Sequence, residues 1–233
     1  MRTRLYVAAV FMGVVGSALF AVLIIQFGGD DPSPPSLQDN PRLEIPGALV
    51  FVDKKGCVSV IQASGADRKQ VACPVGPGLQ EVTWVDEGRV AYRGYDRNAD
   101  EWIAIDVATG KETLLGPGPD SYQNASLVSA QGERLVVDRS GDIYVARGAE
   151  TARFFEFHGN ADDGLPEFVT WSPDGEWVVL RYWPDEELWI IRRDGSIAGS
   201  LGGSLVGGPD GRFSWLIPGA GKVPLRELPA PSR

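Results

Sequence analysis

The sequence predicts an all-β protein: a small β-propeller of about five short four-stranded blades, preceded by one transmembrane α-helix. Three observations lead to this prediction. An apolar run opens the chain, short strand-like runs bounded by Gly, Asp and Pro follow from residue 47 onward, and one turn motif recurs about every 40 residues. The 29 glycines and 17 prolines among 233 residues supply the many turns that such a fold requires.

The N-terminal segment is predicted to anchor the protein in a membrane. Residues 5–27 contain no charged side chain, and a helix of 23 residues is about 35 Å long, enough to cross a bilayer core of about 30 Å. Two arginines precede this run and two aspartates follow it, so the positive-inside rule places the N-terminus in the cytoplasm and the rest of the chain outside. A cleaved signal peptide is the alternative, but its apolar region is shorter. We therefore expect an uncleaved, single-pass anchor in the cell membrane.

Four parts of the chain follow from these patterns. They are the transmembrane anchor at residues 1–28, a Pro-rich linker at 29–46, the propeller domain at 47–228 and a C-terminal tail at 229–233. The linker composition is typical of an extended polar segment, which would hold the folded part away from the membrane. The formal net charge of -9 argues against a nucleic-acid partner, because such a partner requires a basic face.

Five similar units follow the linker. The clearest runs from Val169 to Leu180 and reads strand, Pro-Asp-Gly turn, strand. The turn glycines of the five units are spaced by 41, 44, 43 and 36 residues: Gly47, Gly88, Gly132, Gly175 and Gly211. Each unit continues into a second hairpin, so it offers about four short strands, as a propeller blade does. A β-sandwich with Asp-Gly turns is one alternative, and four blades plus a composite one, closed by pairing of the chain ends, is another.

The fourth unit carries the full signature of a known repeat. Trp171-Ser172-Pro173-Asp174-Gly175 is followed by an apolar strand, and Leu188-Trp189-Ile190-Ile191 then leads to Asp194-Gly195. This pattern resembles the WD40-like (PD40) repeat of TolB-type β-propellers. The resemblance extends over roughly residues 47–226, and it is recognisable in the second unit and loose in the other three. It implies a platform for protein interaction that binds through a rim face or the central channel.

Four of the seven tryptophans are expected to pack between blades. Trp84 and Trp171 occupy equivalent places in their units, and Trp102 and Trp189 are interpreted as a second equivalent pair. Equivalent placement indicates a packing role, because a large aromatic side chain fills the gap between adjacent sheets.

One tryptophan outside this pattern marks the predicted partner contact. Trp183 stands in a short segment with Asp185, Glu186 and Glu187, which is expected to connect two strands. An aromatic side chain beside acidic residues on a propeller rim is suited to binding another protein. A half-buried loop anchor is the alternative role for this tryptophan.

The two cysteines are predicted to form a disulfide. Cys57 and Cys73 lie symmetrically about Gly65, so a hairpin centred there places them directly opposite each other. A disulfide suits the oxidising compartment in which the membrane anchor would place this domain. Two free buried thiols are the alternative.

No catalytic residue, cofactor site or metal site is predicted. His158 is the only histidine, and Asp174 and Asp210 fit the geometry of Asp-Gly turns. The segment from Asp96 to Asp100 opens like an EF-hand loop but lacks the later glycine and glutamate, which leaves only a weak calcium site open.

The expected function is therefore that of a non-enzymatic, membrane-anchored, extracytoplasmic TolB-like propeller that binds an unidentified extracytoplasmic protein. The alternative is an extracytoplasmic, glycosidase-like hydrolase with carboxylates around the propeller channel. The expected inner strands carry no acidic residue, so an enzyme would have to use loop carboxylates such as Asp86 or Asp120.

Overall fold

The computed structural model describes the following residues: 44–53, 55–73, 79–94, 101–117, 128–156, 165–182, 187–195, 198–201, 205–206, 213–223 and 228–230. The chain divides into two compact units, Met1–Asp31 and Pro32–Arg233. The predicted anchor and most of the predicted linker lie outside the described residues, so both stay predictions. None of the described residues forms a helix that is long and apolar enough to span a membrane.

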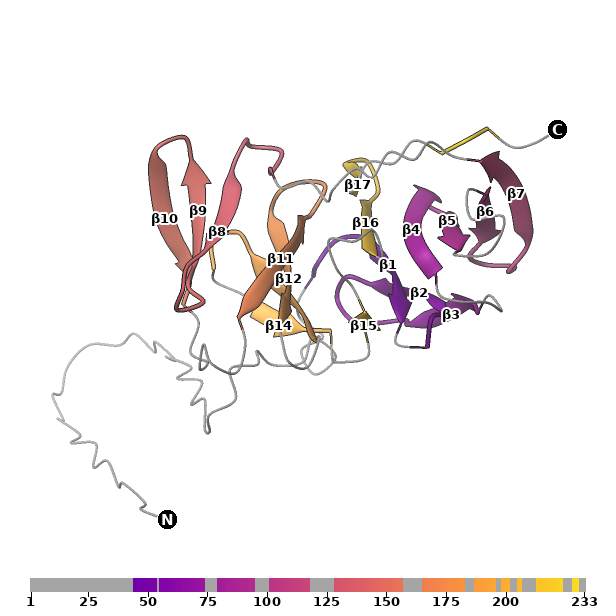
Figure 1. The fold of residues 1–233 in the computed structure, drawn as a ribbon, viewed down its shortest axis with the longest axis horizontal. Coiled ribbons are helices and arrows are strands. Elements are labelled where there is room, and N and C mark those ends of the chain that lie inside the picture. The colour runs from indigo at the N-terminus through magenta and orange to yellow at the C-terminus, as the bar shows by residue number, and fades with distance from the viewer. Residues whose placement is uncertain are drawn as a thin grey trace, which may run out of the picture. The chain divides into compact units, whose positions relative to one another are not determined.

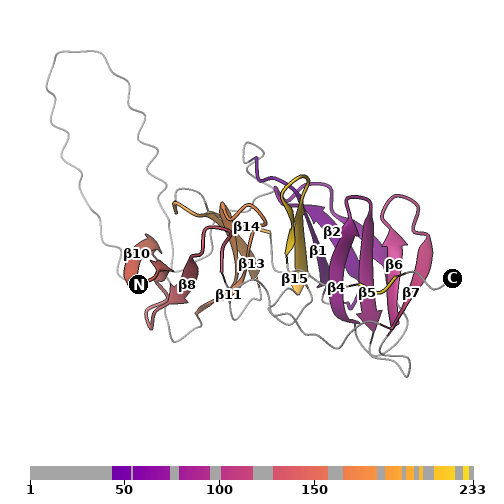
Figure 2. The ribbon, with the colours of Figure 1, turned by 90° about the horizontal axis from the view of Figure 1, so that it is seen from above.

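All regular structure in these ranges is β, as the sequence predicts, and it forms four small antiparallel sheets (Figure 1). Sheet 2 contains β4 (Leu79–Asp86), β5 (Arg89–Gly94), β6 (Glu101–Asp106) and β7 (Glu112–Pro117). Sheet 3 contains β8 (Arg134–Val137), β9 (Ile143–Arg147) and β10 (Glu150–Phe155). Sheet 4 contains β11 (Pro166–Trp171), β12 (Trp177–Tyr182), β13 (Glu187–Arg192) and β14 (Ala198–Ser200). In each of these sheets consecutive strands are neighbours, as Figure 2 shows for β4 to β7, and this is the meander arrangement of a propeller blade.

Sheet 1 joins the first and the last strands of the described chain. It contains β1 (Ala48–Asp53), β2 (Val58–Gln62), β3 (Lys69–Ala72), β15 (Leu205–Val206), β16 (Phe213–Ile217) and β17 (Gly221–Val223). Two short strands from the end of the chain pair with successive parts of β1, through Val52↔Val206 and Phe51↔Phe213. The described residues thus form four sheets where the sequence predicts about five blades, because the first and fifth units share one sheet. The late strands satisfy the backbone groups that β1 would otherwise expose at its edge.

Apolar side chains on facing sheets form the core. Leu49 and Trp215 of sheet 1 cluster with Leu188 of sheet 4, and on its other face sheet 1 packs against Trp84 of sheet 2. Ile143 of sheet 3 clusters with the remaining face of sheet 4. Sheet 3 therefore packs against sheet 4, sheet 4 against sheet 1, and sheet 1 against sheet 2. Among the described residues, no hydrophobic cluster joins sheet 2 to sheet 3.

The predicted equivalence of Trp84 and Trp171 is confirmed. Trp84 pairs with Val90 and Trp171 with Val178, at the same place in the first hairpin of each unit. Both side chains are almost completely buried, and each packs on the sheet formed by the preceding unit. Trp215 takes the same role in sheet 1, where it packs against sheet 4.

The predicted equivalence of Trp102 and Trp189 is wrong, because their positions differ by one residue. In sheet 2, Trp102 pairs with Arg93, whereas the arginine at the same place in sheet 4, Arg181, pairs with Leu188. Leu188 therefore takes the place of Trp102, and Trp189 lies on the opposite face of its sheet. Successive strand residues point to opposite faces, so a shift of one position separates these side chains completely.

The predicted disulfide is present in sheet 1. Cys57 and Cys73 are bonded, with their Cα atoms 4.2 Å apart. They directly flank the cross-strand pair Val58↔Ala72, which has the register that symmetry about Gly65 predicts. The bond therefore joins the ends of β2 and β3 that lie away from the hairpin turn.

Candidate functional site

The turn of the fourth unit is built by its own polar side chains. Ser172 Oγ donates a hydrogen bond to Asp174 Oδ1 and accepts one from Trp177 N at 2.9 Å. Asp174 Oδ1 also accepts a bond from Glu176 N at 3.1 Å. Gly175 has a φ of +73°, which side-chain-bearing residues rarely adopt. This geometry confirms the structural role predicted for Asp174, whereas Asp210 lies outside the described residues.

The turn of the third unit has the same design and reaches over to the fourth. Ser129 Oγ accepts hydrogen bonds from Gln131 N at 3.2 Å and Glu133 N at 3.1 Å. Gln131 Nε2 then donates to Asp174 O at 3.0 Å, across the gap between sheets 3 and 4. A Cβ atom on Gly175 would clash with Gln131 Oε1, so a larger residue there would displace the Gln131 side chain from this contact.

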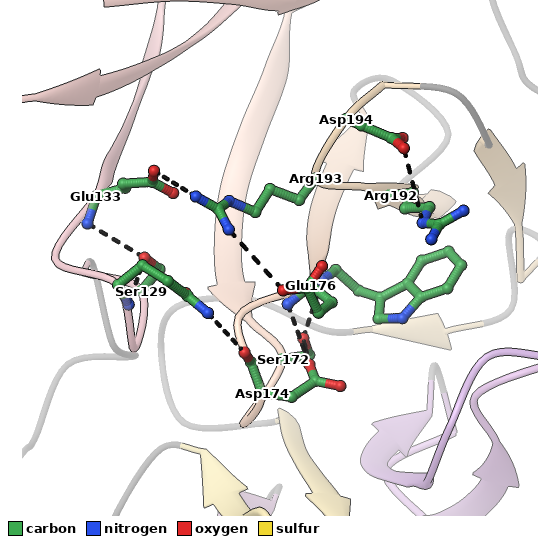
Figure 3. A network of polar contacts seen from close by, with 10 residues as sticks. Ser129, Glu133, Ser172, Asp174, Glu176, Arg192, Arg193 and Asp194 are labelled. Carbon is green, nitrogen blue, oxygen red and sulfur yellow. Dashed lines mark hydrogen bonds and ion pairs between the residues drawn. The ribbon is translucent and has the colours of Figure 1, made fainter. Parts of the chain in front are cut away.

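Arg193 connects the two turns (Figure 3). Its Nη2 donates to Glu133 Oε1 at 2.5 Å, and its Nη1 lies 3.8 Å from Glu176 Oε1. The Glu133 side chain is only 7% exposed and that of Arg193 is 30% exposed. The backbone contributes as well, because Arg193 N donates to Glu176 O at 2.8 Å. This network holds sheet 3 against sheet 4 in one orientation.

The other face of sheet 3 is exposed, and we call it the Val136 face. The pairs Val128↔Arg134, Val136↔Tyr144 and Arg134↔Ala146 place these five residues on one side of the sheet. Val136 is 48% exposed and Val128 is 37% exposed. The alternating residues of β8 and β9, which include Leu135, Val137 and Ile143, pack against sheet 4 instead.

Comparison with the other units shows that this face departs from their pattern. Val136 and Val179 stand at the same distance after the turn glycines of their units, and each pairs with the next strand, through Val136↔Tyr144 and Val179↔Ile190. Val179 and Ile190 are completely buried in sheet 4, whereas in sheet 3 Val136 is 48% exposed and Tyr144 is half-buried. A face that is buried in the neighbouring sheet remains accessible here.

Charged groups border the Val136 face. Arg134 is exposed on it, and Arg153, next to Tyr144, forms ion pairs of 3.3 Å with Asp142 and Glu156. The hydrogen bond from Ser140 lowers the pKa of Asp138, and desolvation together with the nearby Asp138 charge raises the pKa of Tyr144. At neutral pH the face thus presents a protonated tyrosine and two valines between arginines and the ionised Asp138.

Only one of the four predicted partner-contact residues is described. Glu187 Oε2 accepts a hydrogen bond from Trp189 Nε1 at 3.1 Å, and Glu187 Oε1 accepts one from Ser200 Oγ. It therefore ties together the last two strands of sheet 4. Trp183, Asp185 and Glu186 lie outside the described residues, so their role in partner binding stays a prediction.

One of the loop carboxylates considered for catalysis, Asp86, lies within the described residues. Asp86 accepts hydrogen bonds from Gly88 N at 3.0 Å and from Arg89, and the Arg89 side chain lowers its pKa. A carboxyl group with a lowered pKa is a poor general acid, so Asp86 serves the turn. Asp120, His158 and the Asp96–Asp100 segment lie outside the described residues. Within the part of the chain that the structure describes, no group of three or more His, Cys, Asp or Glu could hold a metal ion.

Sequence reasoning missed the residues that join the two units. Glu133 and Glu176 stand one residue after their turn glycines, so alignment of the units would have paired them. Arg193 carries no local signal, because its partner Glu133 is 60 residues away in sequence. The Val136 face was missed for the same reason, since exposure depends on which sheets pack together.

The similarity to solved structures is distant. No protein-family model matches the chain, and no curated protein sequence matches it. TolB from Acinetobacter baumannii is 14% identical with a TM-score of 0.28, over 66% of this chain and 41% of that one. A putative TolB from Agrobacterium tumefaciens is 16% identical with a TM-score of 0.25, over 71% and 68%. The tricorn protease is 7% identical with a TM-score of 0.34, over 70% and 26%. The match thus spans less than half of the length of the first TolB.

Proposed function

We propose that the protein is a membrane-anchored, extracytoplasmic TolB-like β-propeller that acts as a non-enzymatic protein-interaction scaffold. The observation that supports this best is the Val136 face, where Val136 is exposed and Tyr144 is half-buried, at positions that the neighbouring sheet buries as Val179 and Ile190. The repeated PD40-like turns and the meander sheets support the propeller part of the proposal.

The composition of the Val136 face suits a protein partner. Interfaces combine an apolar centre with a polar rim and are enriched in Tyr and Arg. Val136, Val128 and Tyr144 form such a centre, and Arg134 and Arg153 stand beside it. The partner chemistry that complements these groups is an apolar protein surface bordered by acidic side chains.

The contacts that hold the Val136 face in place also favour binding. The Arg193–Glu133 ion pair and the contact from Gln131 to Asp174 fix sheet 3 on sheet 4. A face held in one orientation by its neighbours loses little conformational freedom when a partner binds, which favours affinity.

The placement outside the cytoplasm is supported by two features of the chain. The apolar run at residues 5–27 has arginines before it and aspartates after it. The Cys57–Cys73 disulfide is of a kind that persists in oxidising compartments.

The interaction is tested by chemical cross-linking of the full-length protein in its own membranes. Val136→Asp should abolish the cross-linked product, because a charge then occupies the centre of the proposed interface. Leu114→Asp is the matched control, since Leu114 on sheet 2 is similarly exposed at 43%. Loss of the product in Val136→Asp alone supports the proposal, and equal behaviour of the two variants contradicts it.

The side of the membrane on which the domain lies is tested separately. Ala230→Cys in the full-length protein adds one exposed thiol, because the two native cysteines are paired. A membrane-impermeant maleimide should label this thiol on intact cells. Labelling only after lysis would show that the domain faces the cytoplasm.

A further inference from the structure

One face of sheet 2 is covered by a distant part of the chain. Ala91, Trp102, Ala104 and Leu115 form a cluster on this face, and each is at most 5% exposed. Leu228, which belongs to no strand, packs against the cluster. We call these four residues the Trp102 face.

The same positions in sheet 4 contact another sheet. Sheets 2 and 4 can be aligned on Trp84 and Trp171, which occupy the same position. In this alignment the strand registers show that the four residues of the Trp102 face correspond, in order, to Val179, Leu188, Ile190 and Leu201 of sheet 4. These four side chains cluster with Leu49, Phe51 and Trp215 of sheet 1. Leu228, in the segment of residues 228–230 that we call the Leu228 segment, therefore packs on sheet 2 against the face whose counterpart on sheet 4 packs against a neighbouring sheet.

The Trp102 face also offers a hydrogen-bond donor. The Trp102 side chain is 2% exposed, and its indole Nε1 is buried without a hydrogen-bond acceptor among the described residues. The Arg93 guanidinium lies 5.7 Å from the centre of the Trp102 ring, on the same side of the sheet. The Leu228 segment supplies no acceptor to this N–H group, so its fit to the face depends on the apolar contact of Leu228.

We infer that the Trp102 face is a binding surface for an extended, leucine-containing peptide segment, and that the chain's own Leu228 segment is its occupant. The two small residues of the face, Ala91 and Ala104, leave room for the leucine side chain, whereas the equivalent positions in sheet 4 hold Val179 and Ile190. Residues 228–230 belong to no strand, so release of this segment breaks none of the ladder hydrogen bonds of sheet 2. This inference does not depend on the Val136 face.

The test uses a thiol placed under the occupant in the full-length protein. Ala104→Cys puts a small buried group on the Trp102 face, and the native cysteines are already paired. Adding Leu228→Asp should release the segment and raise the maleimide labelling rate about tenfold, because an aspartate cannot replace the apolar contact. Ala230→Asp, at an exposed residue of the same segment, should leave the rate unchanged. An unchanged rate in Leu228→Asp overturns the inference.

A synthetic peptide and a second thiol complete the test. The peptide Pro-Leu-Arg-Glu-Leu-Pro-Ala, which has the sequence of residues 224–230, should restore protection in the Leu228→Asp protein. The same peptide with aspartate in place of its second leucine should not. Ala63→Cys, in the core between sheets 1 and 4, should stay protected throughout. If it is labelled as fast as Ala104→Cys, the segment is part of the global core and the inference is wrong.

Discussion

Removal of the Arg193 side chain should destabilise the contact between sheets 3 and 4. In Arg193→Ala the Glu133 carboxylate loses the guanidinium that lies 2.5 Å away, although its own side chain is only 7% exposed. Removing one member of a buried ion pair costs about 3–5 kcal/mol, because the remaining charge is left without compensation. The Arg193 side chain is 30% exposed, so water reaches the space it leaves and reduces the loss. We expect a decrease of about 2–3 kcal/mol in the free energy of unfolding.

Urea unfolding of the full-length protein in detergent, followed by far-UV circular dichroism, measures this decrease. The matched control is Arg192→Ala, because Arg192 is the neighbouring residue and its contact with Asp194 is exposed and 3.8 Å long. This control should change stability by less than about 0.5 kcal/mol. Combining Arg193→Ala with Glu133→Gln should recover part of the loss, since no buried charge remains.

Two results would refute this reasoning. Equal effects of Arg193→Ala and Arg192→Ala would mean that the buried partner adds nothing to the arginine contact. Strict additivity of Arg193→Ala and Glu133→Gln would mean that the two side chains do not interact, and that the contact from Gln131 to Asp174 joins the turns instead.

Three further predictions address other parts of the fold. Trp215→Ala should lower the free energy of unfolding by about 3–5 kcal/mol in urea titrations, because its fully buried ring joins the first and last strands of the chain to sheet 4; a loss below 1 kcal/mol would contradict this packing role. Joint replacement of Cys57 and Cys73 by serine should cost about 3 kcal/mol on the chain-entropy model for a sequence separation of 16, and a reducing agent should destabilise the native protein but not this variant. Asp86→Asn should be less stable than the native protein above pH 4, and this difference in stability should shrink as the pH falls below that value. The reason is that the Arg89 hydrogen bond lowers the pKa of Asp86 in the folded protein below 3.8. The stability that the ionised carboxylate adds is therefore present above the unfolded pKa and is lost as the folded carboxylate is protonated. A difference that is constant from pH 2 to pH 6 would argue against the pKa shift.

Much of the fold can be predicted from the sequence because its signals are local. Asp174-Gly175 and Gly132 mark turns that close within a few residues, and the hairpin that pairs Cys57 with Cys73 is defined by symmetry about one glycine. Such features depend on neighbouring residues and on the strand period of two. The all-β class, the meander sheets and the disulfide therefore agree with the structure.

The candidate sites follow a different pattern. Glu187 is predicted to contact a partner from its position in an acidic segment, and this stays a prediction; the structure adds that it bonds Trp189 and Ser200 within sheet 4. The Val136 face gave no signal, since a valine in a strand has the same local pattern whether its face is covered or not. Whether a face is covered depends on the partner sheet, which comes from a remote part of the chain.

By itself, the sequence determined the strand-and-turn texture, the recurring units, the bonded cysteines and the equivalence of Trp84 and Trp171. Only the tertiary structure decided that the first and last strands share one sheet, that Trp102 and Trp189 lie on opposite faces, and that Arg193 holds two units together. The physical reason is the range of the interactions. Turns and hairpins are fixed by contacts between residues close in sequence, whereas a strand register that differs by one residue, or a contact across 60 residues, is fixed by the packing of whole sheets.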